Sequence, residues 1–133
     1  MGVLIDTDVF VLAERSKRQL DFSAWTAFGT AYISSITVSE LLVGVHKANT
    51  PARKRARSAF VEAIIARIPT LAFSSESARV HARLIAALPS SVTVGAHDAL
   101  IAAQAVEHDH VVLTHNIRDF ERIPEVKVIR FDA

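Results

Sequence analysis

Two acidic side chains follow the first apolar run of this sequence at a spacing that suits cation binding. Asp6 and Asp8 stand directly after residues 3–5, on either side of Thr7. Two carboxylates this close repel each other unless a cation or a hydrogen-bond network receives them. We therefore expect Asp6 to belong to a functional site, whereas Asp8 fits either that site or the N-cap of a following helix.

Three further acids occupy positions with both a chemical and a structural explanation: Glu40, Asp98 and Asp119. Residues 37–40 match a capping box, in which Glu40 would reach back to the start of its own helix. Asp98 could cap a helix that starts near residue 97. The polar segment 114–119 could be an ordinary solvated loop. Each acid taken alone leaves both explanations open.

Short apolar runs alternate with longer helix-like segments along the whole chain. The predicted strands cover residues 3–5, 31–33, 68–73, 111–113 and 127–130, and the predicted helices cover residues 7–14, 37–46, 50–67, 77–88 and 97–108. Helices of ten or more residues between strands imply crossover connections, and hence a mostly parallel sheet covered on both faces. Ligand sites of such sheets lie at the carboxyl ends of the strands. This α/β architecture would bring Asp6, Glu40, Asp98 and Asp119 to one place.

Composition is that of one soluble domain spanning residues 1–133. Half of the residues are apolar and 22% are charged, which excludes a disordered chain. Cysteine is absent, so disulfides and thiolate metal sites are excluded, and the six histidines show no metal-ligand spacing. No apolar run approaches the roughly 18 residues of a spanning helix. We expect a cytoplasmic protein without a zinc site.

Positive charge is concentrated in one segment. Residues 41–61 contain five basic residues and no acid, which leaves 10 basic and 14 acidic residues elsewhere. The five are Lys47, Arg53, Lys54, Arg55 and Arg57. Several of them fall in the first turns of the predicted helix 50–67, which Thr50 would cap with Pro51 at its first position. The helix dipole disfavours cations there, so we expect this segment to bind phosphate groups or an acidic protein.

The buried face of the predicted helix 50–67 is expected at Ala56, Ala59, Phe60, Ala63 and Ile64.

Four segments in this order resemble the PIN-domain nucleases, specifically the VapC toxin type of bacterial toxin–antitoxin pairs. They are LIDTDV at residues 4–9, SELLVG at 39–44, HDALIAA at 97–103 and THNIRDF at 114–120. The resemblance covers the whole chain and implies a three-layer α/β/α fold. It also implies that Asp6, Glu40, Asp98 and Asp119 hold Mg²⁺ or Mn²⁺ and cleave RNA, leaving a 5′-phosphate and a 3′-hydroxyl.

The resemblance extends to supporting residues and partners. Asp8 stands where the family usually has Asn, so its role stays open between ligand and cap. Thr7, Asp8, Thr114 and Asn116 are expected to support the site, and Asp119 is expected on a loop. A VapB-type antitoxin and a homodimer are implied, with the basic segment contacting RNA or antitoxin.

Electrostatics and the coordination chemistry of magnesium suggest a role for each acid. Magnesium keeps several waters and accepts one or two carboxylates, for which Asp6 and Asp98 are our first choice. Glu40 and Asp119 would then position a second ion or orient the attacking water. Four clustered carboxylates cannot all remain ionised without such charge compensation.

Other protein classes share parts of this pattern. Residues 4–9 also match the opening of haloacid-dehalogenase-like phosphatases. That family requires a strand ending in Ser or Thr before its later acidic motif, whereas here the strand-ending Thr114 comes after Asp98. A receiver domain needs an acid at the end of a third strand, where Ser74 and Ser75 stand instead. A PIN-like binding module with degenerate catalysis remains the non-enzymatic alternative.

Overall fold

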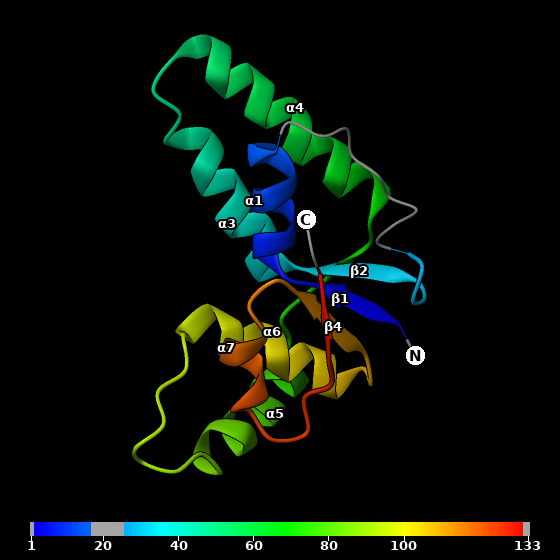
Figure 1. Cartoon of the computed structure of the whole chain (residues 1–133), viewed down its shortest axis with the longest axis vertical. Coiled ribbons are helices and arrows are strands. Elements are labelled where there is room, and N and C mark those ends of the chain that lie inside the picture. Colours follow the sequence, from blue (N-terminus) through cyan, green and yellow to red (C-terminus); the bar gives the residue numbers. More distant parts are fainter. Residues whose placement is uncertain (1, 17–25, 132–133) are drawn as a thin grey trace.

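The computed structural model describes residues 2–16 and 26–131 of the chain, and Figure 1 shows their arrangement. Within these ranges, five strands form one sheet: β1 (Val3–Ile5), β2 (Ala31–Ser34), β3 (Thr70–Leu71), β4 (Val111–Thr114) and β5 (Val128–Arg130). All of the pairings are parallel, in the order β3-β2-β1-β4-β5. The parallel sheet expected from the sequence is confirmed, and β1 lies at its centre.

The carboxyl ends of the two central strands lie side by side. Ile5 is in register with Leu113, and the backbone N–H of Asp6 donates to the carbonyl of Leu113 over 2.9 Å. The residues that follow β1 therefore face the end of β4, where Thr114 stands. This edge of the sheet is where ligand sites of parallel α/β proteins form.

Six helices connect and cover the strands in the described part of the chain: α1 (Thr7–Arg15), α3 (Ser35–His46), α4 (Pro51–Arg67), α5 (Ser75–Ala86), α6 (Ala96–Glu107) and α7 (Ile117–Glu121). The predicted start of α4 is confirmed, because the Thr50 side chain accepts from the N–H of Arg53 and Pro51 is the first helical residue. In Figure 1, α3 and α4 form a hairpin that extends away from the sheet.

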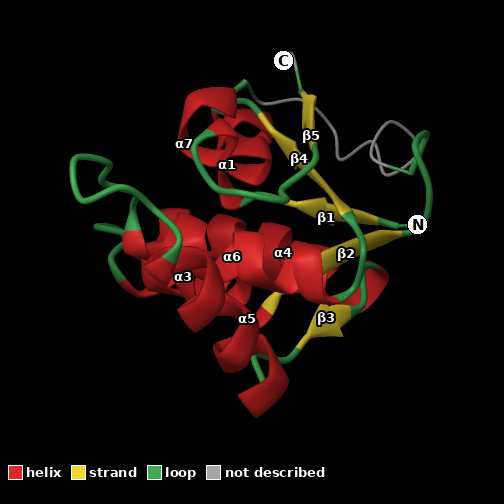
Figure 2. Cartoon of the chain, turned by 90° about the horizontal axis from the view of Figure 1, so that it is seen from below, coloured by secondary structure: helices red, strands yellow, loops and turns green. Residues whose placement is uncertain are grey.

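Two separate cores show why the sheet needs helices on both faces. Val3 and Ile5 belong to one core with residues of α1, α3 and α4, whereas Leu4 belongs to the other with residues of α5, α6 and α7. Successive strand side chains point to opposite faces, so an entirely apolar strand must be covered twice. Figure 2 shows the helices around the twisted sheet. The three-layer α/β/α fold is confirmed.

Several element boundaries differ from the prediction. Helix α3 starts at Ser35 and α5 at Ser75, each about two residues early, because Ser34 and Ser74 supply the caps. Strand β3 is only two residues long and lies at the sheet edge, where pairing is available on one side alone.

The expected buried face of α4 is partly wrong. Ala56 and Ala59 are exposed, whereas Ile64 is buried and Phe60 packs against the same core, as expected. Val61, which was not predicted, is buried beside them. Alanine fits an exposed or a buried position equally, so its spacing is a weak guide to the buried face. Over residues 2–16 and 26–131, no helix combines the length and the apolar character that crossing a membrane requires.

Candidate functional site

The predicted acids meet in one cavity of about 270 Å³ at the carboxyl edge of the sheet. Its lining consists of Asp6, Thr7, Asp8, Val11, Glu40, Asp98, Asn116 and Asp119. These side chains come from the starts of α1, α6 and α7 and from the middle of α3. The structure thus brings together Asp6, Glu40, Asp98 and Asp119, together with Asp8, which the sequence left open between the site and a helix cap.

Asp6 lies deepest and serves two roles. It caps α1, since its Oδ1 accepts from the N–H of Thr7 over 2.8 Å, and its Oδ2 accepts from the hydroxyl of Thr114 over 2.9 Å. Asp6 as a whole is only 5% exposed to solvent. Burial and, after it, the charge of the neighbouring Asp8 carboxylate together raise the pKa of Asp6 to about 8. A metal-free Asp6 is therefore largely protonated near neutral pH.

Asp8 faces the cavity and does not cap α1. The N-cap position belongs to Asp6, and Asp8 stands in the first turn of the helix. Its Oδ2 is 3.2 Å from the hydroxyl of Thr114, and its Oδ1 accepts from the N–H of His115 over 3.3 Å. Of the two roles left open for Asp8, the helix cap is wrong.

Glu40 does not belong to a capping box. Helix α3 begins at Ser35, and its cap is Ser34, whose hydroxyl accepts from the N–H of Ile36 over 3.0 Å. This early start places Glu40 in the second turn, one turn beyond the position a capping box requires. Its Oε1 accepts instead from the hydroxyl of Thr7 over 2.9 Å. Glu40 is thereby directed at the cavity and away from its own helix start.

Asp98 lies in the first turn of α6, whose N-cap is Gly95 without a side-chain cap bond. The missing side chain matters, because a Cβ at Gly95 would stand 3.2 Å from Oδ2 of Asp98. The pKa of Asp98 is raised to about 6. Burial is the largest cause, Asp119 is the next, and the charges of Glu40 and Asp8 contribute more weakly. The interpretation of Asp98 as an ordinary cap is wrong.

Asp119 lies on a helix, although the sequence predicted a loop. The five-residue helix α7 contains it in its first turn, and the side-chain amide of Asn116 donates to its Oδ2. The backbone N–H of Asn116 donates in turn to the Thr114 hydroxyl over 3.0 Å. Thr114 and Asn116 therefore connect the end of β4 to Asp119, as the expected supporting roles require.

Two polar residues at this site were not assigned to it from the sequence. The Nδ1 of His97 lies 3.3 Å from Oε2 of Glu40. Thr37 was assigned to the capping box, yet it is fully buried and its hydroxyl lies 2.9 Å from that of Thr7. Only the close approach of α3 to α1 and α6 reveals these contacts, so spacing along the chain could not have found them.

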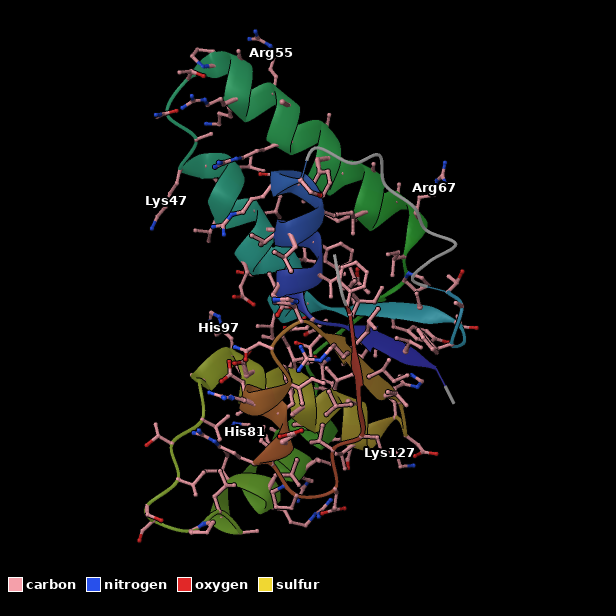
Figure 3. The ribbon with its side chains drawn as sticks, viewed as in Figure 1. Lys47, Arg55, Arg67, His81, His97 and Lys127 are labelled. Carbon is pink, nitrogen blue, oxygen red and sulfur yellow. The ribbon has the colours of Figure 1, made fainter. Side chains whose placement is uncertain are left out.

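The basic segment occupies the far end of the α3–α4 hairpin. Lys47, Arg53, Lys54 and Arg55 are exposed there, and Figure 3 shows Lys47 and Arg55 pointing away from the body of the molecule. Arg57 differs, because its Nε lies 3.3 Å from Oε1 of Glu14 and its Nη1 donates to the carbonyl of Gly44.

Arg57 lines a second cavity of about 320 Å³ between α1, α3 and α4. This cavity shares Thr7 and Glu40 with the acidic one. The two cavities are therefore adjacent. Arg57 turns inward and lines the second one, whereas Lys47, Arg53, Lys54 and Arg55 line neither.

The donor set fits a hard divalent cation. Carboxylate, amide and hydroxyl oxygens line the acidic cavity, and none of its described lining residues is basic. Burial raises the pKa values of Asp6 and Asp98, and neighbouring carboxylates raise them as well. Among the described residues, no three acidic or histidine side chains form a complete metal site by themselves. A cation at this site would therefore take its remaining ligands from water or from a substrate.

Comparisons with known proteins show which proteins this chain resembles. The family model described as PIN domain matches residues 3–126. Ribonuclease VapC1 of Rickettsia felis is 38% identical over 130 residues, covering 97% of this chain and 96% of that protein. The tRNA(fMet)-specific endonuclease VapC of Salmonella typhimurium is 38% identical over 97 residues, covering 72% and 71%.

Solved structures show the same architecture. The DNA-bound VapBC structure from Salmonella typhimurium has a chain that matches with a TM-score of 0.84 at 29% identity, covering 98% of each chain. VapBC2 from Rickettsia felis, bound to a promoter DNA fragment, matches with a TM-score of 0.87 at 25% identity, covering 99% of this chain and 100% of the other.

Proposed function

Because this chain belongs to the PIN domain family, and within it to the VapC ribonucleases, we propose that it is a metal-dependent endoribonuclease and the toxin of a toxin–antitoxin pair. The observation that carries this proposal is the convergence of five carboxylates on one cavity at the carboxyl edge of the sheet. Membership of this family also makes the phosphatase alternative wrong. We treat residues 1–133 as a single PIN domain.

Asp6 and Asp98 are the proposed principal ligands of Mg²⁺ or Mn²⁺. Burial raises the pKa values of both, so a nearby positive charge would stabilise the ionised form of each. When bound, the cation supplies charge that offsets the phosphate oxygens and activates water for attack on phosphorus. Thr114 holds Asp6 from the end of β4, and the bare backbone of Gly95 leaves room for the Asp98 carboxylate.

Glu40 and Asp119 are proposed to hold a second ion or to orient the attacking water. Glu40 approaches from α3 and Asp119 from α7, so the two acids flank the deeper pair. Supporting residues fix them: Thr7 donates to Glu40, and Asn116 donates to Asp119. Asp8 adds a further negative charge beside Asp6, which strengthens the attraction for a cation.

RNA is the proposed substrate, with the basic hairpin end contacting its phosphates. Two relatives support this, since their names describe a ribonuclease and a tRNA(fMet)-specific endonuclease. Four exposed cations lie beyond the cavity that adjoins the acidic site. An RNA strand that passes from the acids along this second cavity would place its neighbouring phosphates near the exposed cations.

A VapB-type antitoxin is the proposed protein partner, because two structures similar to this chain, from Rickettsia felis and Salmonella typhimurium, are named as VapBC. We also propose a homodimer, on the strength of family resemblance. The basic segment could serve the antitoxin as well as RNA, and salt-dependent binding measurements with each partner separate the two. A catalytically degenerate binding module is the alternative that the following experiment addresses.

The test is RNA cleavage by the purified chain with a mixed tRNA and rRNA substrate. We expect cleavage with Mg²⁺ or Mn²⁺, none with a chelator, and recovery when the ion is added back in excess. The products are expected to carry 5′-phosphate ends. Tight RNA binding without cleavage under any metal condition would instead support the binding module.

A further inference from the structure

Gln104 is a fully buried polar side chain that does not line the acidic cavity. It lies in α6, the helix that supplies Ile101 and Ala105 to one of the two cores. Burying an amide costs free energy unless its donor and its acceptor both find partners. The partners of Gln104 lie in other elements of the fold, so this amide connects parts that are far apart in the sequence.

Both ends of the Gln104 amide form hydrogen bonds. Its Nε2 donates to the carbonyl of Leu71 over 3.0 Å, at the end of the edge strand β3. Because a carbonyl only accepts, the amide oxygen Oε1 faces the other way, where it accepts from the hydroxyl of Ser34. The Ser34 oxygen accepts in turn from the N–H of Ile36 over 3.0 Å, as the cap of α3. Gln104 therefore links α6 to the start of α3.

This link joins two helices whose buried apolar residues belong to different cores. Leu41 and Val45 of α3 lie in one core. Ile101 and Ala105 of α6 lie in the core on the other face of the sheet. Apolar packing has no preferred direction, so packing within two separate cores leaves the distance between α3 and α6 weakly determined. A hydrogen bond between two fully buried side chains is directional and is not exposed to competing water, so it can fix that distance.

Each of the two linked helices carries an acid of the proposed metal site. Glu40 lies six residues after Ser34 along α3, and Asp98 lies six residues before Gln104 along α6. A shift of α3 against α6 at the link therefore changes the separation of the two acids. A second contact between these helices, of Glu40 with His97, is weaker support, because the His97 side chain is 59% exposed and water competes for it.

We propose that Gln104 is a positioning residue that sets the place of Glu40 relative to Asp98, acting through Ser34. The inference rests on the proposed function, in which Asp98 is a principal ligand of the cation and Glu40 holds a second ion or orients the attacking water. Without the amide, the buried Ser34 hydroxyl loses its acceptor and α3 is free to shift against α6. The two acids then no longer keep one fixed separation.

Two substitutions remove the link from its two ends. Gln104→Leu is close in size and removes both polar groups of the amide. Ser34→Gly removes the hydroxyl but keeps a residue type that caps a helix nearly as well. Ser77→Ala is the matched control, because Ser77 is also fully buried and donates to Glu107 over 2.6 Å, which links α6 to α5 instead. Mn²⁺ affinity by calorimetry, kcat and KM for RNA, and Tm are measured for each variant and for the double variant.

We expect each single variant to weaken Mn²⁺ binding and to lower kcat by roughly 10- to 100-fold, because a misplacement of about 1 Å can cost about 100-fold in rate. KM for RNA stays unchanged. The double variant is no worse than the poorer single variant, since both changes remove the same hydrogen bond. Ser77→Ala lowers Tm alone.

The inference is overturned if Gln104→Leu or Ser34→Gly folds and matches the wild type in Mn²⁺ affinity and kcat. It is also overturned if Ser77→Ala loses as much kcat for the same fall in Tm, since the effect would then be one of stability. If Gln104→Leu does not fold, Ser34→Gly decides alone. A wild type without chelator-sensitive cleavage overturns the proposed function itself.

Discussion

The hydroxyl of Thr114, at the end of β4, donates a hydrogen bond of 2.9 Å to Oδ2 of Asp6, which follows β1. The two residues are far apart in the sequence, and the register of Ile5 with Leu113 brings them together. This bond opposes the effect of burial, because it lowers the pKa of Asp6 while burial and Asp8 raise it. Thr114 therefore keeps Asp6 closer to its metal-binding form.

Thr114→Val is expected to weaken Mn²⁺ binding at pH 7 by about 3- to 10-fold, because removing the donor raises the pKa of Asp6. The deficit should narrow toward pH 9, where Asp6 loses its proton in either protein. Thr114→Ser should bind like the wild type. Calorimetry at three pH values measures this, and a Thr114→Ser variant as weak as Thr114→Val would count against the hydrogen bond.

Mn²⁺ affinity of the wild type is expected to rise steeply between pH 6 and pH 8. The pKa of Asp98 is about 6 and that of Asp6 about 8, and each must lose its proton to bind the ion. Near pH 7, binding should release about one proton per ion. Calorimetry in two buffers with different ionisation enthalpies counts these protons. A pH-independent affinity without proton release would show that these acids are not the ligands.

Asp6→Asn is expected to stabilise the metal-free protein at pH 8. An acid with a raised pKa holds its proton more tightly when folded, so the free energy of unfolding falls as pH rises from the ordinary value of 3.8 to about 8. The substitution removes this loss of stability. A gain of about 1 kcal/mol in the free energy of unfolding would raise Tm by roughly 4 °C. Little change is expected at pH 4. A variant that melts below the wild type at pH 8 would contradict the assigned pKa.

The double variant Lys54→Gln, Arg55→Gln is expected to raise KM for RNA while kcat stays unchanged. Both cations are exposed at the end of the hairpin, beyond the acidic cavity. If each contacts one phosphate of a single strand, the slope of log K against log salt concentration should become shallower by about 1.4. Arg79→Gln, an exposed cation on α5, is the control. An unchanged KM and salt slope would remove RNA as the ligand of these cations.

The general position of the site was predictable, because it follows from a rule about strands. Asp6 comes directly after β1, and the starts of α6 and α7 meet it at the same edge of the sheet. Parallel strands place their carboxyl ends together whatever the details of the helices. Asp6, Asp98 and Asp119 could therefore be gathered from the order of the elements alone.

The local environments of Glu40 and Asp119 could not be predicted, since each depends on where a helix starts. Ser34, Ser35 and Thr37 can all act as caps, and the structure uses Ser34, the earliest of the three. Helix α7 has five residues, too few for a periodic pattern to appear.

Contacts between helices were beyond the reach of the sequence. The approach of His97 on α6 to Glu40 on α3 depends on how two helices pack across the sheet edge, and no spacing encodes it. The same holds for the salt bridge of Arg57 with Glu14, which turns one member of the basic segment inward.

The central claim is that the acidic cavity performs the cleavage, and the most direct test compares cleavage with RNA binding in Asp6→Asn and Asp98→Asn. Asp109→Asn, which changes an exposed acid before β4, is the control. We predict that both site variants lose at least about 100-fold in kcat, the order found when a group that stabilises transition-state charge is removed, while they bind RNA at least as tightly as the wild type. Cleavage at the wild-type rate by either variant would contradict the account.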